Sequence, residues 1–266
     1  MFLPQWLARE RTITTQPPAA TPALPRLALP AGAVHLWQLA LPAPCARVRR
    51  ATALLAPDER RRALTFHFAR DRLRFIAVRA TLRLLLARHL ALPPRQITLS
   101  AGAHGKPAIA ERGPEGTRLC FNVSHTDGLA LFALAWEREL GVDVERVRPM
   151  PALDQIAARF FAPAERAALA ALPPDDQLAG FFACWTRKEA YLKAHGAGLS
   201  LALDRFTVSL APHEPARLLN ALDDPDAPAR WRLAALALPV GYCGALVAVG
   251  HDWTLEPRGD AAFLLA

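Results

Sequence analysis

The alternation of apolar and polar residues over 178–195 predicts one amphipathic helix, which ends before Gly196 and Gly198. Glycine is the usual residue just past a helix C-terminus, so these two positions mark the end of the helix. At about 100° per residue, one half of the helix surface carries an aromatic ring, a carboxylate and two ammonium groups. The residues on this half are Trp185, Lys188, Glu189, Leu192 and Lys193. An ordinary core-facing helix with a Glu189–Lys193 ion pair has the same pattern, so the helix alone does not establish a site.

A strand is predicted about forty residues earlier, at 139–146. Val142 and Val144 alternate with Asp143 and Glu145, which places the two carboxylates on one face. Two neighbouring acids repel each other unless a cation lies between them, although a solvent-exposed strand face is the ordinary alternative. Together with Glu189 they make three carboxylates, a set that suits Mg²⁺ with phosphate oxygens as further ligands.

The remaining pattern alternates strands with helices on both sides of residue 141. Strands are predicted at 33–41, 96–100, 118–124, 128–136, 205–210, 230–237 and 242–250, and a short tail follows the last one. Helices are predicted from Pro57 onward, then over 65–90, 152–160 and 163–171. Residues 1–30 hold six prolines, few charges and no regular period, which predicts a flexible arm instead of a folded unit.

Composition limits the partners. The chain of 266 residues has a formal charge of +8, which implies nucleic acid, a phosphate-rich ligand or an acidic protein. Its four cysteines form no Cys-x-x-Cys pair, so reduced thiols in a cytoplasmic protein are expected. No secretory signal is recognised at the start. Residues 233–250 are uncharged, but Pro239 and Gly241 divide them into two strands, so a soluble protein without a membrane partner is expected.

Four short motifs occur in one order along the chain. They are Gly105-Lys106-Pro107, Phe121-Asn122-x-Ser124-His125, Gly141-Val-Asp143-Val-Glu145 and Trp185-x-x-Lys188-Glu189-Ala190-x-x-Lys193-x-x-Gly196-x-Gly198-Leu199. Their order over residues 55–210 resembles the 4′-phosphopantetheinyl transferases of the surfactin-synthetase-activating (Sfp-like) type. Four motifs in order are far more specific than any one of them.

The resemblance implies an α+β fold of two similar halves in a pseudo-twofold arrangement, with the substrate in the cleft between them. The expected division is an arm at 1–30, a half at 31–140 that binds coenzyme A, and a half at 141–266 with the metal and catalytic residues. The implied reaction transfers 4′-phosphopantetheine from coenzyme A to a serine of an acidic apo carrier protein and releases 3′,5′-ADP. A cytoplasmic monomer is expected, and the carrier's pathway (fatty acid, polyketide or peptide synthesis) is not distinguished.

The resemblance also implies the roles of individual residues. Asp143, Glu145 and Glu189 would hold Mg²⁺, and Glu189 would take the serine proton directly or through a water. Lys193 would stabilise the transferring phosphoryl oxygens, with Lys188 as a second donor or a wall of the coenzyme A site.

Coenzyme A would be held mainly by the first half. Lys106 and Pro107 would line the nucleotide pocket, and Ser124 and His125 would bind phosphate oxygens. In the family a basic residue on one helix and an arginine on the next hold the 3′-phosphate. A gap-free alignment through this arginine-rich stretch places those roles on Arg62 and Arg74.

Two other functions remain open at this point. A basic nucleic-acid-binding module fits the charge but lacks interleaved exposed aromatic residues. A catalytically silent relative would bind coenzyme A or a carrier without transfer, although all three carboxylates and both lysines are present. If a carrier docks, the Phe160-Phe161 turn and Arg159 are the expected contact surface.

Overall fold

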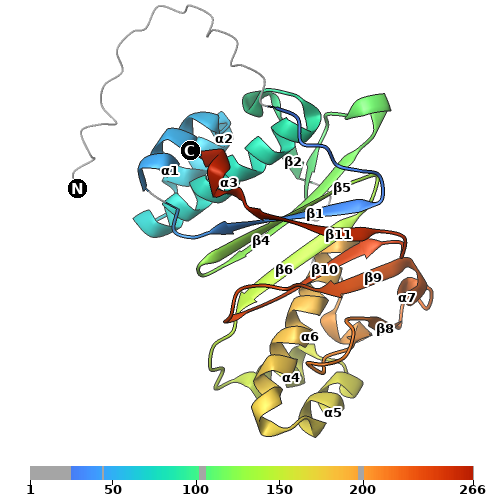
Figure 1. Ribbon diagram of the computed structural model, residues 1–266. Helices are drawn as coiled ribbons and strands as arrows, with labels where there is room; N and C mark the ends of the chain where they lie inside the picture. Colours follow the sequence, from blue (N-terminus) through green and yellow to red (C-terminus); the bar gives the residue numbers. More distant parts are fainter. Residues whose placement is uncertain (1–24, 44, 102–105, 197–200, 266) are drawn as a thin grey trace, which may run out of the picture.

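The computed structural model describes residues 25–43, 45–101, 106–196 and 201–265 (Figure 1). The predicted arm therefore lies outside the described residues except for positions 25–30, as do Gly105, Gly198 and Leu199 of the motifs. The elements of the first half are β1 (Ala33–Ala40), α1 (Cys45–Ala51), α2 (Pro57–Leu64), α3 (Ala69–Leu90), β2 (Leu99–Ala101), β3 (Pro107–Ile109), β4 (Leu119–Thr126) and β5 (Leu129–Trp136).

The elements that follow begin with the predicted acidic strand. They are β6 (Leu140–Arg146), α4 (Leu153–Phe160), α5 (Pro163–Ala171), α6 (Pro174–His195), β7 (Phe206–Val208), β8 (Leu218–Ala221), α7 (Ala227–Arg230), β9 (Trp231–Ala235), β10 (Tyr242–Val249) and β11 (Thr254–Asp260). No helix in these described ranges is long and apolar enough to cross a membrane.

The molecule has four layers, helix–sheet–sheet–helix, which Figure 1 shows from top to bottom. The first sheet has the strand order β11-β1-β5-β4 and the second β6-β10-β9, while β2-β3 and β7-β8 form small two-stranded sheets. Helix α3 covers the outer face of the first sheet and α6 the outer face of the second. The predicted α+β fold of two halves is confirmed, since each half packs a long helix on its own sheet.

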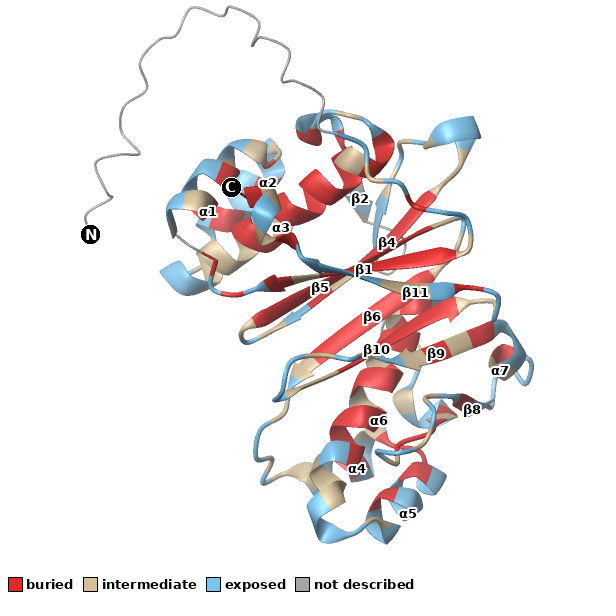
Figure 2. Ribbon diagram, viewed as in Figure 1, coloured by how far each residue is buried: buried red, intermediate tan, exposed pale blue. Residues whose placement is uncertain are grey.

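Side-chain alternation explains why the two sheets stack. In β5, Leu129 and Leu131 face the second sheet, whereas Ala130 and Phe132 face the helices of the first half. Both faces are buried (Figure 2), so the strand is apolar throughout. Strand β10 repeats the arrangement on the other side, with Leu246 toward the first sheet.

One glycine brings the long helix of the second half onto the acidic strand. A Cβ on Gly141 would collide with the backbone of Ala190 and Ala194 in α6, so the close packing of α6 on β6 requires glycine there. Because side chains alternate along a strand, Asp143 and Glu145 share the face of Gly141 and point toward α6. The local packing therefore places the two carboxylates beside the helix that carries Glu189.

The end of the chain returns to the first half. The sequence predicted a short tail after residue 250, and this was wrong because residues 254–260 form β11, which pairs in parallel with β1. Ala261 and Leu265 then join the apolar core of the first half. No local pattern announced this strand, since its side chains are mostly exposed and its partner lies more than 200 residues away. Apart from this strand and the residues after it, the division of the chain into two halves at residue 141 stays a prediction.

Candidate active site

A compact polar group joins β4, β6 and α6. Ser124 Oγ donates to Asp143 Oδ1 at 2.8 Å, and Lys193 Nζ donates to the same oxygen at 2.6 Å. Lys193 Nζ also lies 3.0 Å from Ser124 Oγ. Asp143 is buried, so this group links the two halves at a point that solvent screens only weakly. Three residues from three of the predicted motifs thus meet here.

The period of two along β4 selects which of its side chains reach β6. Asn122, Ser124 and Thr126 share one face, and Asn122 Oδ1 accepts the Val142 backbone N–H at 2.9 Å. Thr126 Oγ1 donates weakly to Glu145 Oε2 at 3.4 Å. Sequence reasoning assigned no role to Asn122 or Thr126, although their alternation with apolar residues in β4 was visible.

Asp143, Glu145 and Glu189 influence one another electrostatically. Burial, followed by the negative charge of Asp143, raises the pKa of both Glu145 and Glu189. Asp143 Oδ2 is buried and has no hydrogen-bond partner among the described residues. An orphaned carboxylate oxygen beside two other acids fits the chemistry of a divalent cation that takes oxygen ligands.

The carboxylates are not arranged as a ready ligand cage. Over the described parts of the chain, no group of three or more His, Cys, Asp or Glu side chains is placed to hold a metal ion. The ammonium of Lys193, which is 30% exposed, instead neutralises Asp143.

A positively charged region continues from this group along β4 toward α3. Partial burial, then the positive charges of Arg74 and Lys193, lower the pKa of His125. Arg74 Nη2 also lies 2.8 Å from Asp127 Oδ1. Arg62 is exposed on α2 with its guanidinium 5.6 Å from the Phe66 ring centroid. The structure thus brings Arg74 to His125, whereas no contact of the described residues joins Arg62 to either.

A pocket of about 250 Å³ lies between α3 and β4. It has His125 and Arg79 as its titratable groups and is otherwise mostly apolar. Its lining residues are Phe75, Val78, Arg79, Leu82, Pro107, Phe121, Asn122, Val123 and His125. Sequence reasoning missed the α3 wall, since the apolar residues of that helix point in nearly every direction and do not distinguish a pocket from the core.

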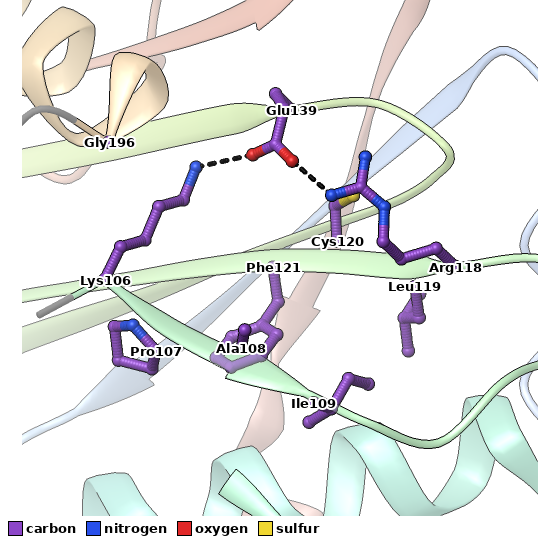
Figure 3. Close-up of a pocket in the computed structure, with 10 residues that line it drawn as sticks. All are labelled: Lys106, Pro107, Ala108, Ile109, Arg118, Leu119, Cys120, Phe121, Glu139 and Gly196. Carbon is purple, nitrogen blue, oxygen red and sulfur yellow. Dashed lines mark hydrogen bonds and ion pairs between the residues drawn. The ribbon is translucent and has the colours of Figure 1, made fainter. Parts of the chain in front are cut away.

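A second pocket, of about 220 Å³, is lined by β3, the start of β4 and Glu139 (Figure 3). Glu139 stands between two cations there, with Lys106 Nζ at 2.8 Å from Oε2 and the Arg118 guanidinium on Oε1. Lys106 Nζ also donates to the Ala194 carbonyl at 3.0 Å, which ties β3 to the end of α6. Pro107 lines both pockets, and the roles of Arg118 and Glu139 were not foreseen from the sequence.

The side chain of Lys188 does not point to the group around Asp143. Lys188 was predicted as a second donor or a wall of the coenzyme A site, but the structure places it in a buried ion pair with Glu165. Its Nζ lies 2.7 Å from Glu165 Oε2 and donates to the carbonyls of Leu203 and Phe206 at 2.7 and 2.6 Å. Both charged side chains are completely buried. Five residues along a helix correspond to about 140° of rotation, so Lys188 and Lys193 face different neighbours. Trp185 packs on Phe160 of α4, with the two ring centroids 5.8 Å apart.

Comparison with known proteins defines the class of this site. A model described as the 4′-phosphopantetheinyl transferase superfamily matches residues 139–247, and a model for the N-terminal part of 4′-phosphopantetheinyl transferases matches residues 42–137. The 4′-phosphopantetheinyl transferase HetI of a Nostoc species is 40% identical over 233 residues, covering 87% of this chain and 94% of that protein. The 4′-phosphopantetheinyl transferase Sfp of Bacillus subtilis is 28% identical over 204 residues, covering 77% and 86%.

The protein is therefore a group-transfer enzyme. The chain belongs to the 4′-phosphopantetheinyl transferase superfamily, as its four motifs predicted. Transfer of 4′-phosphopantetheine is its activity, and the matches lend no support to the nucleic-acid-binding or catalytically silent alternatives.

Proposed function

We propose that this enzyme transfers 4′-phosphopantetheine from coenzyme A to a serine hydroxyl of an acidic apo carrier protein, with Asp143, Glu145 and Glu189 as the ligands of Mg²⁺. The serine oxygen forms a bond to the β-phosphorus of the pyrophosphate, and the bond to 3′,5′-ADP breaks. The observation that carries this proposal is the buried Asp143 Oδ2, which has no hydrogen-bond partner in the described structure and lies beside two acids of raised pKa.

Bound Mg²⁺ would offset the negative charge that grows on the leaving 3′,5′-ADP. The three carboxylates are the chain's own contribution to holding it. Their mutual repulsion is the electrostatic support for this assignment, because an added cation near Asp143 would lower the pKa of both glutamates.

In this proposal the side chain of Lys193 contacts Asp143 before coenzyme A binds and the phosphoryl oxygens afterwards. In the resting structure its ammonium is the counter-charge of Asp143 at 2.6 Å. Its side chain is part exposed, so it can turn toward the transferring phosphoryl oxygens once coenzyme A enters. A fixed ammonium near those oxygens stabilises the charge that develops in the transition state.

Glu189 takes the serine proton directly or through a water. A general base must lie within hydrogen-bond reach of the hydroxyl from which it takes the proton, directly or through one water. Glu189 projects from α6 beside β6, so the helix that carries Lys193 also carries the base.

The nucleotide part of coenzyme A is assigned to the first half. Arg74, His125 and Arg62 would surround the 3′-phosphate, and Ser124 and His125 would contact the other phosphate oxygens. Support comes from the electrostatic coupling of Arg74 to His125. The adjoining pocket of about 250 Å³, with Pro107 in its wall, is of a size and polarity that suit a flat nucleobase. Lys106 lies at the edge of the hairpin that carries Pro107.

The carrier would approach from the side of α4, and a cytoplasmic monomer is sufficient for the reaction. Phe160 is half-buried, with the exposed Arg159 guanidinium 5.1 Å from its ring. Phe161 was expected on this surface, but it is buried in the core of the second half, so Phe160 and Arg159 remain. A basic rim around an apolar residue suits an acidic helix.

The test is to mix the protein with Mg²⁺, coenzyme A and purified apo carriers, then measure carrier mass and released 3′,5′-ADP at increasing salt. A carrier that gains phosphopantetheine fastest at low salt supports the proposal, since screening weakens steered encounter. Arg159→Glu should slow the encounter, and Arg112→Glu, the same charge change in the first half, serves as its control. No modification of any carrier would contradict the proposal.

A further inference from the structure

A groove of about 510 Å³ lies along β9, away from the transfer site. One wall is the edge of β9, and the other is the segment 214–218 that leads into β8. Asp143 is on β6 at the opposite edge of the same sheet, two strands away at about 4.8 Å per strand. The lining residues are Glu214, Pro215, Ala216, Arg217, Leu218, Pro228, Trp231, Arg232, Leu233, Ala234, Ala235 and His251. No step of the transfer reaction uses them.

The backbone of β9 directs hydrogen-bonding groups into this groove. In the antiparallel pair with β10, Gly250 N donates to Arg230 O at 2.7 Å and Leu236 N donates to Gly244 O at 3.0 Å. Even-numbered residues therefore bond to β10. Because bonding alternates along an antiparallel strand, the N–H and C=O groups of Leu233 and Ala235 point to the free edge. No hydrogen bond within the described ranges occupies them.

Little on β9 itself blocks its free edge. Trp231, the first residue of the strand, packs its indole against Tyr191 and His195, so its side chain belongs to the core of the second half. Edge strands are normally blunted by charge, proline or a cover. β9 contains no proline, and its one charged residue, Arg232, turns its guanidinium to the carbonyls of His251 and Trp253.

The charges around the groove select the kind of partner. Arg217, Arg232 and His251 line it. The acid of the lining, Glu214, uses Oε1 to accept the backbone N–H groups of Leu210 and Ala211 at 2.6 and 2.8 Å. Two arginines, Arg217 and Arg232, outweigh the one carboxylate, so the rim has an excess of positive charge beside open strand-pairing groups.

We infer that this groove binds an extended acidic segment of a partner protein, which adds to β9 as a fourth strand of the sheet. Main-chain bonds to Leu233 and Ala235 supply affinity, and acidic side chains opposite Arg217 supply selectivity. The site is independent of the proposed transfer chemistry, so each can fail without the other.

The experiment selects binders from a displayed library of random 12-residue peptides on the immobilised full-length protein. Enriched peptides are synthesised with a fluorophore, and their affinity is measured by anisotropy. We expect enrichment of acidic sequences that alternate apolar and polar residues. Ala235→Pro removes an outward N–H that the β10 ladder does not use, and Arg217→Glu reverses the rim charge. Each should weaken binding by about tenfold or more.

Arg112→Glu is the matched charge control and should leave peptide affinity unchanged. Circular dichroism and transferase activity should match the parent protein in all three variants, since none of these residues lies in the transfer site. If Ala235→Pro fails to fold, backbone N-methylation of the peptide at alternate residues removes the same bonds from the other side. The inference is overturned if no acidic peptide is enriched, or if enriched peptides bind both groove variants as tightly as the parent.

Discussion

The correction at Lys188 leads to a quantitative prediction. Replacing Lys188 by Met removes an ammonium that lies 2.7 Å from Glu165 Oε2, with both side chains completely buried. The remaining Glu165 carboxylate still accepts the Ala162 and Val208 backbone N–H groups but loses its counter-charge. Breaking one partner of a buried ion pair costs about 3–5 kcal/mol, because the other charge stays buried and uncompensated.

The size of the chain converts that cost into a melting temperature. In a domain of about 250 residues, 1 kcal/mol corresponds to roughly 2–4 °C, so Lys188→Met should lower Tm by about 6–20 °C. The double variant Lys188→Met/Glu165→Gln removes both charges and should recover part of the loss. Lys106→Met is the matched control, since its partner Glu139 is 38% exposed and an exposed pair is worth about 1 kcal/mol or less.

The assay is thermal unfolding followed by circular dichroism, combined with transferase activity per folded molecule well below Tm. We expect the stability of Lys188→Met to fall while its activity per folded molecule stays near that of the parent. An unchanged Tm together with a large loss of activity would refute the reasoning, and would return Lys188 to the site that the sequence suggested.

Three further predictions follow from the site and the core. Chelation with EDTA should abolish transfer reversibly. Asp143→Ala or Glu189→Gln should abolish transfer without unfolding the protein. Full activity in EDTA or in either variant would contradict the metal assignment. Arg74→Leu or His125→Gln should weaken the binding of coenzyme A by about tenfold, because a charge-assisted contact to the 3′-phosphate is lost. The binding of dephospho-coenzyme A, measured by the same calorimetry, should weaken much less. Equal losses for the two ligands would argue against these residues. Burial lowers the pKa of His89 from 6.5 to about 4, so its neutral form stabilises the fold above pH 6.5 and that stability is lost as the pH falls toward 4. The loss is about 3 kcal/mol in urea unfolding, and His89→Gln should flatten this dependence; an unchanged slope would contradict it.

Much of the site could be predicted from short stretches of sequence. The alternation at 139–146 placed Asp143 and Glu145 on one strand face, and the structure confirms that they share it. The helical period over 178–195 is that of α6, which ends at Gly196 in a left-handed conformation with a φ of 74°. These patterns succeed because residues near one another in the chain determine which side of an element each side chain occupies.

The sequence by itself therefore determined the family and the main elements, and it predicted that Asp143, Glu145 and Glu189 act together. Only the tertiary structure decided that Lys188 turns to Glu165 while Lys193 turns to Asp143, because two edges of one helix face can contact different neighbours. It also decided that residues 254–260 complete the first sheet and that β9 keeps a free edge. These features depend on contacts between segments that are far apart in the chain. The hydrophobic period of one segment does not determine which distant segment it contacts, because the free energy depends on both partners.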